Sequence, residues 1–261
     1  DVSEVYTNEY SVSGIFAKKA IIALFEEIMR TKQDELNKSY GLNLIYGIDK
    51  YKKLENFKTF DNLFFNGKDD LISYIDSWHH RREKSKEMGI IHKTGISLYG
   101  PPGTGKTSIA KAIAHRHSMN LVLVNLSTFN KDQDLLNYIN AQTSPSIFLF
   151  EDVDEFLGKS KRSNLDGKST VSFSGILQIL DGVNSPDNSI FILTTNLINE
   201  LDPALYRDGR INMRLEIGLP DNQNIQSFVN KYFDSDIVIP NHIPNKLPMA
   251  NVEQILLNSN S

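Results

Sequence analysis

The sequence predicts an α/β fold in which a parallel sheet carries helices on both faces. Short apolar runs of strand length alternate with runs of helical periodicity over most of the chain. A glycine-rich segment at residues 100–107 lies between one such strand and one such helix, and the apolar run at 147–150 ends in acidic residues. Strands that helices connect in this way are parallel and buried on both faces, which explains why the runs are apolar throughout.

Two amphipathic helices and a strand are predicted before the glycine-rich segment. Residues 16–36 and 69–87 place apolar side chains at helical spacing, largely on one face of each helix. Residues 42–48 have the apolar content of a strand, so the N-terminal part is expected to be a small α+β segment. Residues 51–60 are polar and aromatic, which favours a linker between two modules.

The segment at residues 100–107, with the sequence GPPGTGKT, has the features of a phosphate-binding loop. Residues 96–99 are the expected strand before it and residues 108–115 the expected helix after it, which is the context that such a loop requires. Its glycines allow backbone N–H groups to crowd around phosphates, and the helix N-terminus favours anions. We expect Lys106 to reach the β- and γ-phosphates of a nucleoside triphosphate and Thr107 to hold Mg²⁺. The residues predicted to bind the nucleotide are Gly100, Pro101, Pro102, Gly103, Thr104, Gly105, Lys106, Thr107 and Ser108.

Acidic residues at the tip of a neighbouring strand complete the expected site. Residues 147–150 end in Glu151 and Asp152, where hydrolysis requires one acid beside Mg²⁺ and another that orients the attacking water. The apolar register assigns Glu151 to Mg²⁺ and Asp152 to the water. Asp152 is one methylene, about 1.5 Å, shorter than a glutamate, so either the backbone shifts to compensate or hydrolysis is slow. Asn196 follows the strand at 190–193, where an amide can hydrogen-bond the γ-phosphate and the water.

Arg207 and Arg210 flank Gly209 in an expected turn, and two interpretations of them are equally supported. In the first, they are solvated or pair with Asp208, as arginines in exposed turns usually do. In the second, they are arginine fingers that reach the γ-phosphate bound to a neighbouring subunit. A contact of that kind accelerates hydrolysis by about 10³–10⁵.

The chain is expected to divide into three parts. These are an N-terminal accessory segment at 1–60, a nucleotide-binding α/β domain at 61–220 and a short C-terminal helical lid at 221–261, which has weak helical runs at 225–233 and 251–257. The other elements of the α/β domain are expected at 121–126, 133–141, 173–180, 201–210 and 213–217. A polar, basic loop is expected at 158–169.

The composition disfavours several classes of protein. A net charge of −4 counts against a dedicated nucleic-acid binder. The absence of cysteine excludes disulfides, zinc–thiolate sites and cysteine nucleophiles. No apolar run approaches the roughly 18 residues of a membrane-spanning helix, so we expect no membrane span in this chain. Asp1 is not an initiator methionine, so an anchor or targeting segment upstream remains an open expectation.

Taken together, these residues resemble the AAA ATPase family, whose fold is a P-loop NTPase sheet flanked by helices. The resemblance rests on GPPGTGKT, on the apolar strand that ends in acids, and on TTNLINELDPALYRDGR, which is similar to the family's second region of homology. FLFEDVD and VSFSGILQILDGV resemble one branch, the mitochondrial chaperone type that moves the Rieske iron–sulfur protein during assembly of respiratory complex III. The Glu–Asp order is normal in that branch. Asp208 replaces the branch's usual proline, and residues 127–131 lack the aromatic–hydrophobic–glycine pattern of a pore loop.

The resemblance implies an ATPase that uses ATP and Mg²⁺, forms a homo-oligomeric ring of six or seven subunits, and remodels or moves a protein substrate. It implies phosphate and Mg²⁺ roles for Lys106 and Thr107, an acidic pair at 151–152, a sensor role for Asn196, and fingers acting in trans at Arg207 and Arg210. Two alternatives stay open: an assembly switch with little turnover, and a nucleic-acid-handling ATPase that uses the basic loop. The compartment also stays open between the cytoplasm and a membrane-associated position on the mitochondrial matrix side.

Overall fold

The computed structural model describes residues 43–46, 51–53, 58–142, 145–154, 156, 171–181, 185–239 and 247–259. All of them belong to one compact unit, which spans residues 42–261. The predicted helix at 16–36 and the loop at 158–169 lie outside the described residues.

The described strands form one seven-stranded sheet in the order β2-β1-β4-β5-β6-β3-β7. Five neighbouring pairs run parallel, and only β2 runs antiparallel, at the edge beside β1. The strands are β1 Asn43–Tyr46, β2 Tyr51–Lys53, β3 Lys93–Tyr99, β4 Asn120–Leu123, β5 Ser146–Phe150, β6 Ser189–Thr195 and β7 Met213–Glu216. The sheet confirms the predicted parallel α/β class.

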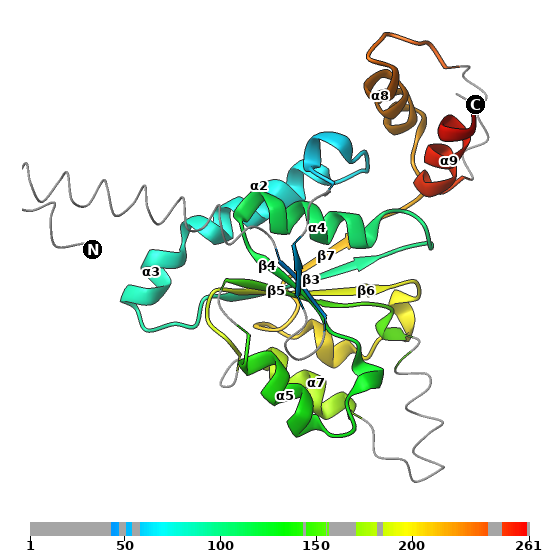
Figure 1. Cartoon of the computed structure of the whole chain (residues 1–261). Helices are drawn as coiled ribbons and strands as arrows, with labels where there is room; N and C mark the ends of the chain where they lie inside the picture. Colours follow the sequence, from blue (N-terminus) through cyan, green and yellow to red (C-terminus); the bar gives the residue numbers. More distant parts are fainter. Residues whose placement is uncertain are drawn as a thin grey trace, which may run out of the picture. The chain divides into compact units, whose positions relative to one another are not determined.

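Helices cover both faces of this sheet, with α2 and α4 on one face and α5 and α7 on the other (Figure 1). The described α-helices are α2 Lys68–His80, α3 Arg82–Glu87, α4 Lys106–His117, α5 Asp132–Asn140, α7 Phe173–Asp181, α8 Asn222–Phe233 and α9 Met249–Ser259. Short 3₁₀ turns lie at Phe60–Asn62, Leu126–Thr128, Ile198–Glu200 and Pro203–Tyr206.

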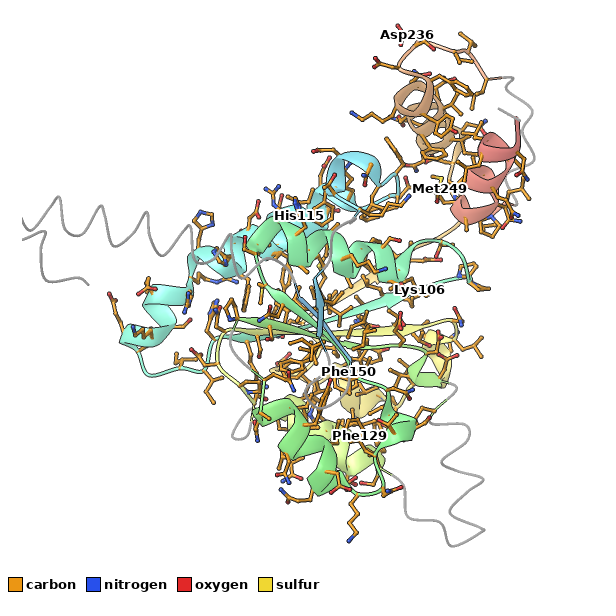
Figure 2. The ribbon with its side chains drawn as sticks, in the orientation of Figure 1. Lys106, His115, Phe129, Phe150, Asp236 and Met249 are labelled. Carbon is orange, nitrogen blue, oxygen red and sulfur yellow. The ribbon has the colours of Figure 1, made fainter. Side chains whose placement is uncertain are left out.

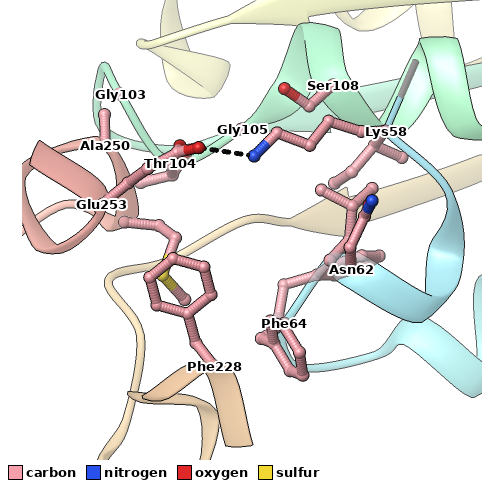
Figure 3. A pocket seen from close by; sticks show the side chains of 14 residues that line it. Lys58, Asn62, Phe64, Gly103, Thr104, Gly105, Ser108, Phe228, Ala250 and Glu253 are labelled. Carbon is pink, nitrogen blue, oxygen red and sulfur yellow. Dashed lines mark hydrogen bonds and ion pairs between the residues drawn. The ribbon is translucent and has the colours of Figure 1, made fainter. Parts of the chain in front are cut away.

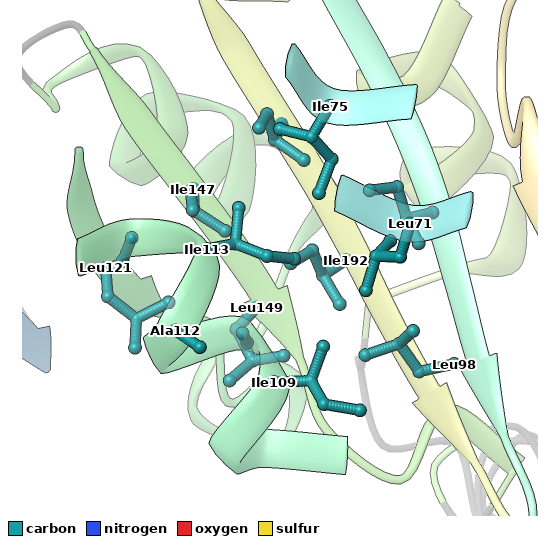
Figure 4. Close-up of a cluster of buried hydrophobic side chains, with 14 of the residues drawn as sticks. Leu71, Ile75, Leu98, Ile109, Ala112, Ile113, Leu121, Ile147, Leu149 and Ile192 are labelled. Carbon is teal, nitrogen blue, oxygen red and sulfur yellow. The ribbon is translucent and has the colours of Figure 1, made fainter. Parts of the chain in front are cut away.

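Two apolar layers hold the helices to the sheet. On one face, Leu71 and Ile75 of α2 and Ile113 of α4 pack over Leu98 and Ile192 of the central strands (Figure 4). The opposite layer packs α5 and α7 on β5 and β6 through Leu135, Ile139, Ile176, Leu180, Phe148 and Phe191. Each such side chain contributes about 1.5–3 kcal/mol by leaving water. The carboxyl ends of the central strands are therefore held from both sides.

Two sequence-based interpretations need correction. Residues 51–60 were expected to be a linker, but Tyr51–Lys53 form β2, because a hairpin partner is available in β1. The helix expected at 69–87 is broken at Arg81, whose N–H donates to the carbonyl of Trp78, three residues back. The second piece, α3, has no buried residue, so packing does not hold it in line with α2.

Candidate nucleotide-binding site

The candidate site lies at the carboxyl ends of β3, β5 and β6. The parallel register pairs Tyr99 of β3 with Thr195 of β6, and Phe150 of β5 with Leu193 of β6. The segments that follow these three strands therefore leave the sheet side by side. This edge is where open parallel sheets bind ligands.

The glycine-rich loop turns sharply before α4 begins at Lys106. The backbone φ angles of Gly100, Gly103 and Gly105 are 142°, 76° and 101°, which residues other than glycine rarely adopt. A Cβ at Gly100 would lie 2.2 Å from the carbonyl oxygen of Ile217, so the close approach of β7 also requires glycine there. The Thr104 hydroxyl donates to the carbonyl of Pro101 at 2.9 Å and closes the loop. Its backbone N–H groups and the N-terminus of α4 then form an anion-binding geometry.

Lys106 is 8% exposed, at the first position of α4 (Figure 2). Its amine donates to the carbonyls of Gly100 and Pro101 at 2.7 and 2.9 Å, and to Oδ1 of Asn196 at 2.9 Å. Burial lowers the pKa of Lys106, and the carboxylates of Asp152 and Asp154 oppose that shift. The sequence predicted Lys106 and Asn196 as members of one site, and the structure brings them into direct contact.

The two members of the acidic pair at the tip of β5 have different partners. The Thr107 hydroxyl donates to Oε1 of Glu151 at 2.5 Å, although 44 positions separate the two residues. Asp152 has a φ of 48°, in the left-handed region, and its N–H donates to the hydroxyl of Thr194 at 3.1 Å. The Asp152 backbone therefore leaves extended geometry immediately after the strand, and its position is set by β6.

Asp154 and Thr194 are two site residues to which the sequence analysis assigned no role. Asp154 is 8% exposed, and its Oδ1 accepts the N–H of Asn196 at 3.3 Å. It thus fixes the backbone of the residue whose side chain holds Lys106. A signal was present, because Asp154 stands two positions after Asp152 at the end of a buried strand.

The two arginines of the turn at 207–210 have different environments in the structure. Arg207 is exposed, and no described residue bonds its guanidinium. Arg210 pairs with Asp181 of α7 and not with Asp208, the partner expected from the first interpretation of the sequence. Asp181 had no role in the sequence analysis, because only the fold brings the end of α7 beside this turn.

A pocket adjoins the outer side of the glycine-rich loop (Figure 3). Apolar side chains of Phe64, Phe228 and Met249 line it together with Gly103 and Ser108. An ion pair of 2.8 Å joins Lys58 to Glu253 of α9 at this pocket (Figure 3). Three segments therefore line one pocket: residues 58–65, the glycine-rich loop and the C-terminal helices.

Comparisons with known proteins agree with this geometry. Residues 96–219 match the family described as "ATPase family associated with various cellular activities (AAA)". The chain is 33% identical over 185 residues to "Probable mitochondrial chaperone bcs1" of Schizosaccharomyces pombe, covering 66% of this chain and 40% of that protein. It is 34% identical over 206 residues to "Probable mitochondrial chaperone BCS1-A" of Dictyostelium discoideum, covering 72% and 47%. An AAA-ATPase of Arabidopsis thaliana is 29% identical over 243 residues, covering 87% and 48%.

The chain belongs to the AAA ATPase family. Within that family it lies in the branch of the BCS1-like proteins. It spans less than half the length of these three relatives. None of the helices in the described part of the chain combines the length and apolar content that crossing a membrane requires.

Proposed function

We propose that this chain is a Mg²⁺-dependent ATPase that hydrolyses ATP to ADP and phosphate at the edge formed by β3, β5 and β6. One observation carries the proposal. At one end of the sheet, Lys106 bonds Asn196, which is 90 positions away, and its neighbour Thr107 bonds Glu151, which is 44 positions away. That arrangement combines a phosphate-binding cation, hard oxygen ligands and a polar group for the γ-phosphate.

The residues present fit Mg²⁺. The Thr107 hydroxyl and the exposed Glu151 carboxylate approach each other to 2.5 Å, and both are the hard oxygen donors that Mg²⁺ prefers. Thr107 would hold the ion directly and Glu151 would hold its water shell. When bound, Mg²⁺ would neutralise charge that develops on the phosphate oxygens during transfer.

The residues of this chain then divide the remaining work. Lys106 binds phosphate oxygens, and its amine exchanges loop carbonyls for the more favourable anionic partners. Asp152 accepts a proton from the attacking water, and Asn196 orients that water against the γ-phosphate. The N–H bonds to Thr194 and Asp154 keep both groups in place before the nucleotide arrives.

The pocket beside the loop is suited to the nucleotide base. Phe64, Phe228 and Met249 offer apolar surface for a flat ring, and Gly103 lets the backbone approach closely. The loop leads from this pocket toward Lys106, so a base there would place its phosphates against the loop N–H groups. ATP bound in this way would occupy the pocket with its base and the loop with its phosphates.

ATP titration and phosphate release test the ATPase proposal. Lys106→Ala should abolish binding, whereas Lys111→Ala, on the same helix, is the matched control and should bind as the unmodified chain does. Asp152→Asn should bind ATP normally and lower kcat by about 10²-fold or more, because it removes the proton acceptor. Undiminished ATP affinity in Lys106→Ala would refute the loop assignment, and normal turnover in Asp152→Asn would move the base elsewhere.

The likeness to mitochondrial chaperones supports a larger role as a chaperone that acts on a protein substrate in a homo-oligomeric ring of six or seven subunits. Phe129, in the position of a pore aromatic, is half-buried, with its ring 5.3 Å from that of Tyr138. That packing favours moving a folded substrate over threading an unfolded chain. The same likeness supports a mitochondrial location.

Light scattering with Asp152→Asn, with and without ATP and Mg²⁺, tests the ring. A closed assembly that forms only with ATP supports shared sites between subunits, and its mass decides between six and seven. A monomer in every condition would contradict ring formation by this chain. Turnover that is slow and does not respond to any protein would favour the assembly-switch alternative.

A further inference from the structure

Arg210, one of the two arginines expected to act on a neighbouring subunit, is bound within its own chain. Its Nε donates to Oδ1 of Asp181, at the last position of α7, and its Nη2 donates to Oδ2 of the same carboxylate at 2.7 Å. Its Nη1 donates to the carbonyl of Ala204 at 2.6 Å. All three nitrogens of the guanidinium are therefore engaged, and the side chain is only 11% exposed.

The backbone of Arg210 is held as tightly as its side chain. Its N–H donates to the carbonyl of Arg207 at 3.1 Å, which closes a turn around Gly209, where φ is 85°. Its carbonyl lies against Gly95 of β3, so closely that a Cβ at Gly95 would come within 2.1 Å of that oxygen. The N–H of Asn212 donates to the carbonyl of Gly95 at 2.9 Å. The backbone of Arg210 therefore cannot move outward without disturbing a central strand, and the orientation of its side chain depends on Asp181 and the carbonyl of Ala204.

The end of α7 is suited to receive this arginine. Asp181 binds Arg210, and the amine of Lys93 donates to the carbonyl of Leu180 at the same helix end. Two cations therefore lie where the carbonyls and dipole of α7 favour positive charge. Bidentate pairing also orients the guanidinium plane, which a single hydrogen bond would not do.

The guanidinium of Arg207 differs from that of Arg210 in exposure and hydrogen bonding, although its charge also helps to lower the pKa of Asp181. It is exposed, no described residue bonds its guanidinium, and it lies at the start of the turn that Arg210 closes. Its neighbours in the turn, Asp208 and Gly209, are exposed as well. Arg207 is thus the arginine of this turn that is available to a second molecule.

We infer that Asp181 is a positioning residue for the proposed ATPase. It holds Arg210 within the chain, and through Arg210 it fixes the turn so that Arg207 alone contacts the nucleotide bound to a neighbouring copy. The inference rests on the proposed function, because a contact between copies requires both the ATP site and the assembly.

Exchange of the two charges tests this assignment. The single variants Asp181→Arg and Arg210→Asp should each lower kcat by about 10²-fold, because the turn loses its anchor, while ATP affinity changes by less than about threefold. The double variant Asp181→Arg/Arg210→Asp restores an ion pair between α7 and the turn. Its kcat should therefore be at least tenfold higher than that of either single variant. Arg207→Ala should lower kcat by about 10³-fold, and no second substitution at position 181 should restore it.

The matched control reverses the charge of Asp208, which lies in the same turn as Arg210, and not that of Asp181. Asp208→Arg combined with Arg210→Asp places the same charges in the same turn without reaching α7, so it should recover nothing. If Arg210 itself contacts the neighbouring nucleotide, the double variant with Asp181→Arg will be as inactive as Arg210→Asp alone. That result, together with near-normal turnover of the single variant Asp181→Arg, would overturn the inference.

Failure of the proposed function is distinguishable from failure of this inference. If the unmodified chain binds no ATP, the function fails, and the pair is then tested by urea unfolding. A double variant that is more stable than either single variant supports pairing within the chain. Strictly additive losses of stability would overturn it.

Discussion

Acidification should destabilise this chain through histidines whose pKa values burial lowers, and His117 has the largest of these shifts. It is the last residue of α4, its side chain is 7% exposed, and its ring lies 4.9 Å from that of His79. Burial lowers the pKa of His117 from 6.5 to about 4, and the charge of His79 adds to the shift. Asp76 lies 3.2 Å away and opposes it, but Arg116 already binds both oxygens of that carboxylate.

The sign of the effect follows from the lowered pKa. Above pH 6.5 the imidazole is neutral in both the folded and the unfolded chain, so its burial carries no charge penalty. Between pH 6.5 and 4 the unfolded chain binds a proton that the folded chain does not, so stability falls as the pH falls. The full loss is about 3 kcal/mol, and about 1.4 kcal/mol of it is present by pH 5.5.

Urea unfolding at pH 7.5, 6.5 and 5.5, without nucleotide, measures this contribution. His117→Gln removes the titrating group, so its free energy of unfolding should fall less steeply with acid than that of the unmodified chain. His115→Gln, on the same helix, is the matched control, because His115 is not among the groups that shift the pKa of His117, and it should change the slope less than His117→Gln. Equal slopes for the unmodified chain and His117→Gln would refute the assignment of this pH dependence to His117.

Two further substitutions probe the loop and the pocket. Gly100→Ala combines an unfavourable φ of 142° with a contact of 2.2 Å to the carbonyl of Ile217. It should lower the free energy of unfolding by about 3 kcal/mol and weaken ATP binding, and an unchanged melting temperature would contradict this. Glu253→Gln breaks the ion pair with Lys58. The side chains of Glu253 and Lys58 are 41% and 35% exposed. Thermal melting should show a loss below about 1 kcal/mol, and a larger loss would mean that the pair is not screened by solvent.

Local patterns were sufficient to predict most of the sheet and the loop. The apolar runs at 147–150 and 190–193 lie within β5 and β6, because continuous burial on both faces leaves an unmistakable pattern. The run at 121–126 stops earlier, at Leu123 of β4, since the chain turns into a 3₁₀ helix that keeps Leu126 buried. In the first two runs every buried apolar residue lies in the strand. In the third run the buried residues continue beyond the end of the strand.

The candidate site shows the same division. A short motif predicts the roles of Lys106 and Thr107, because adjacent residues of one loop create the phosphate-binding geometry. The left-handed backbone of Asp152 and its bond to Thr194 could not be predicted, since they depend on how β5 and β6 end beside each other. The role of Asp154 beneath Asn196 is of the same kind.

By itself the sequence determined the α/β class and predicted the position of the glycine-rich loop and most of the residues that surround it. These properties depend on periodicity and on short motifs, whose physical causes act over a few neighbouring residues. Only the tertiary structure decided that Arg210 pairs with Asp181, that Asp208 is not its partner, and that Arg207 stays exposed. The reason is that an ion pair forms where charges meet in space, and the packing of α7 beside the turn brings together residues 29 positions apart.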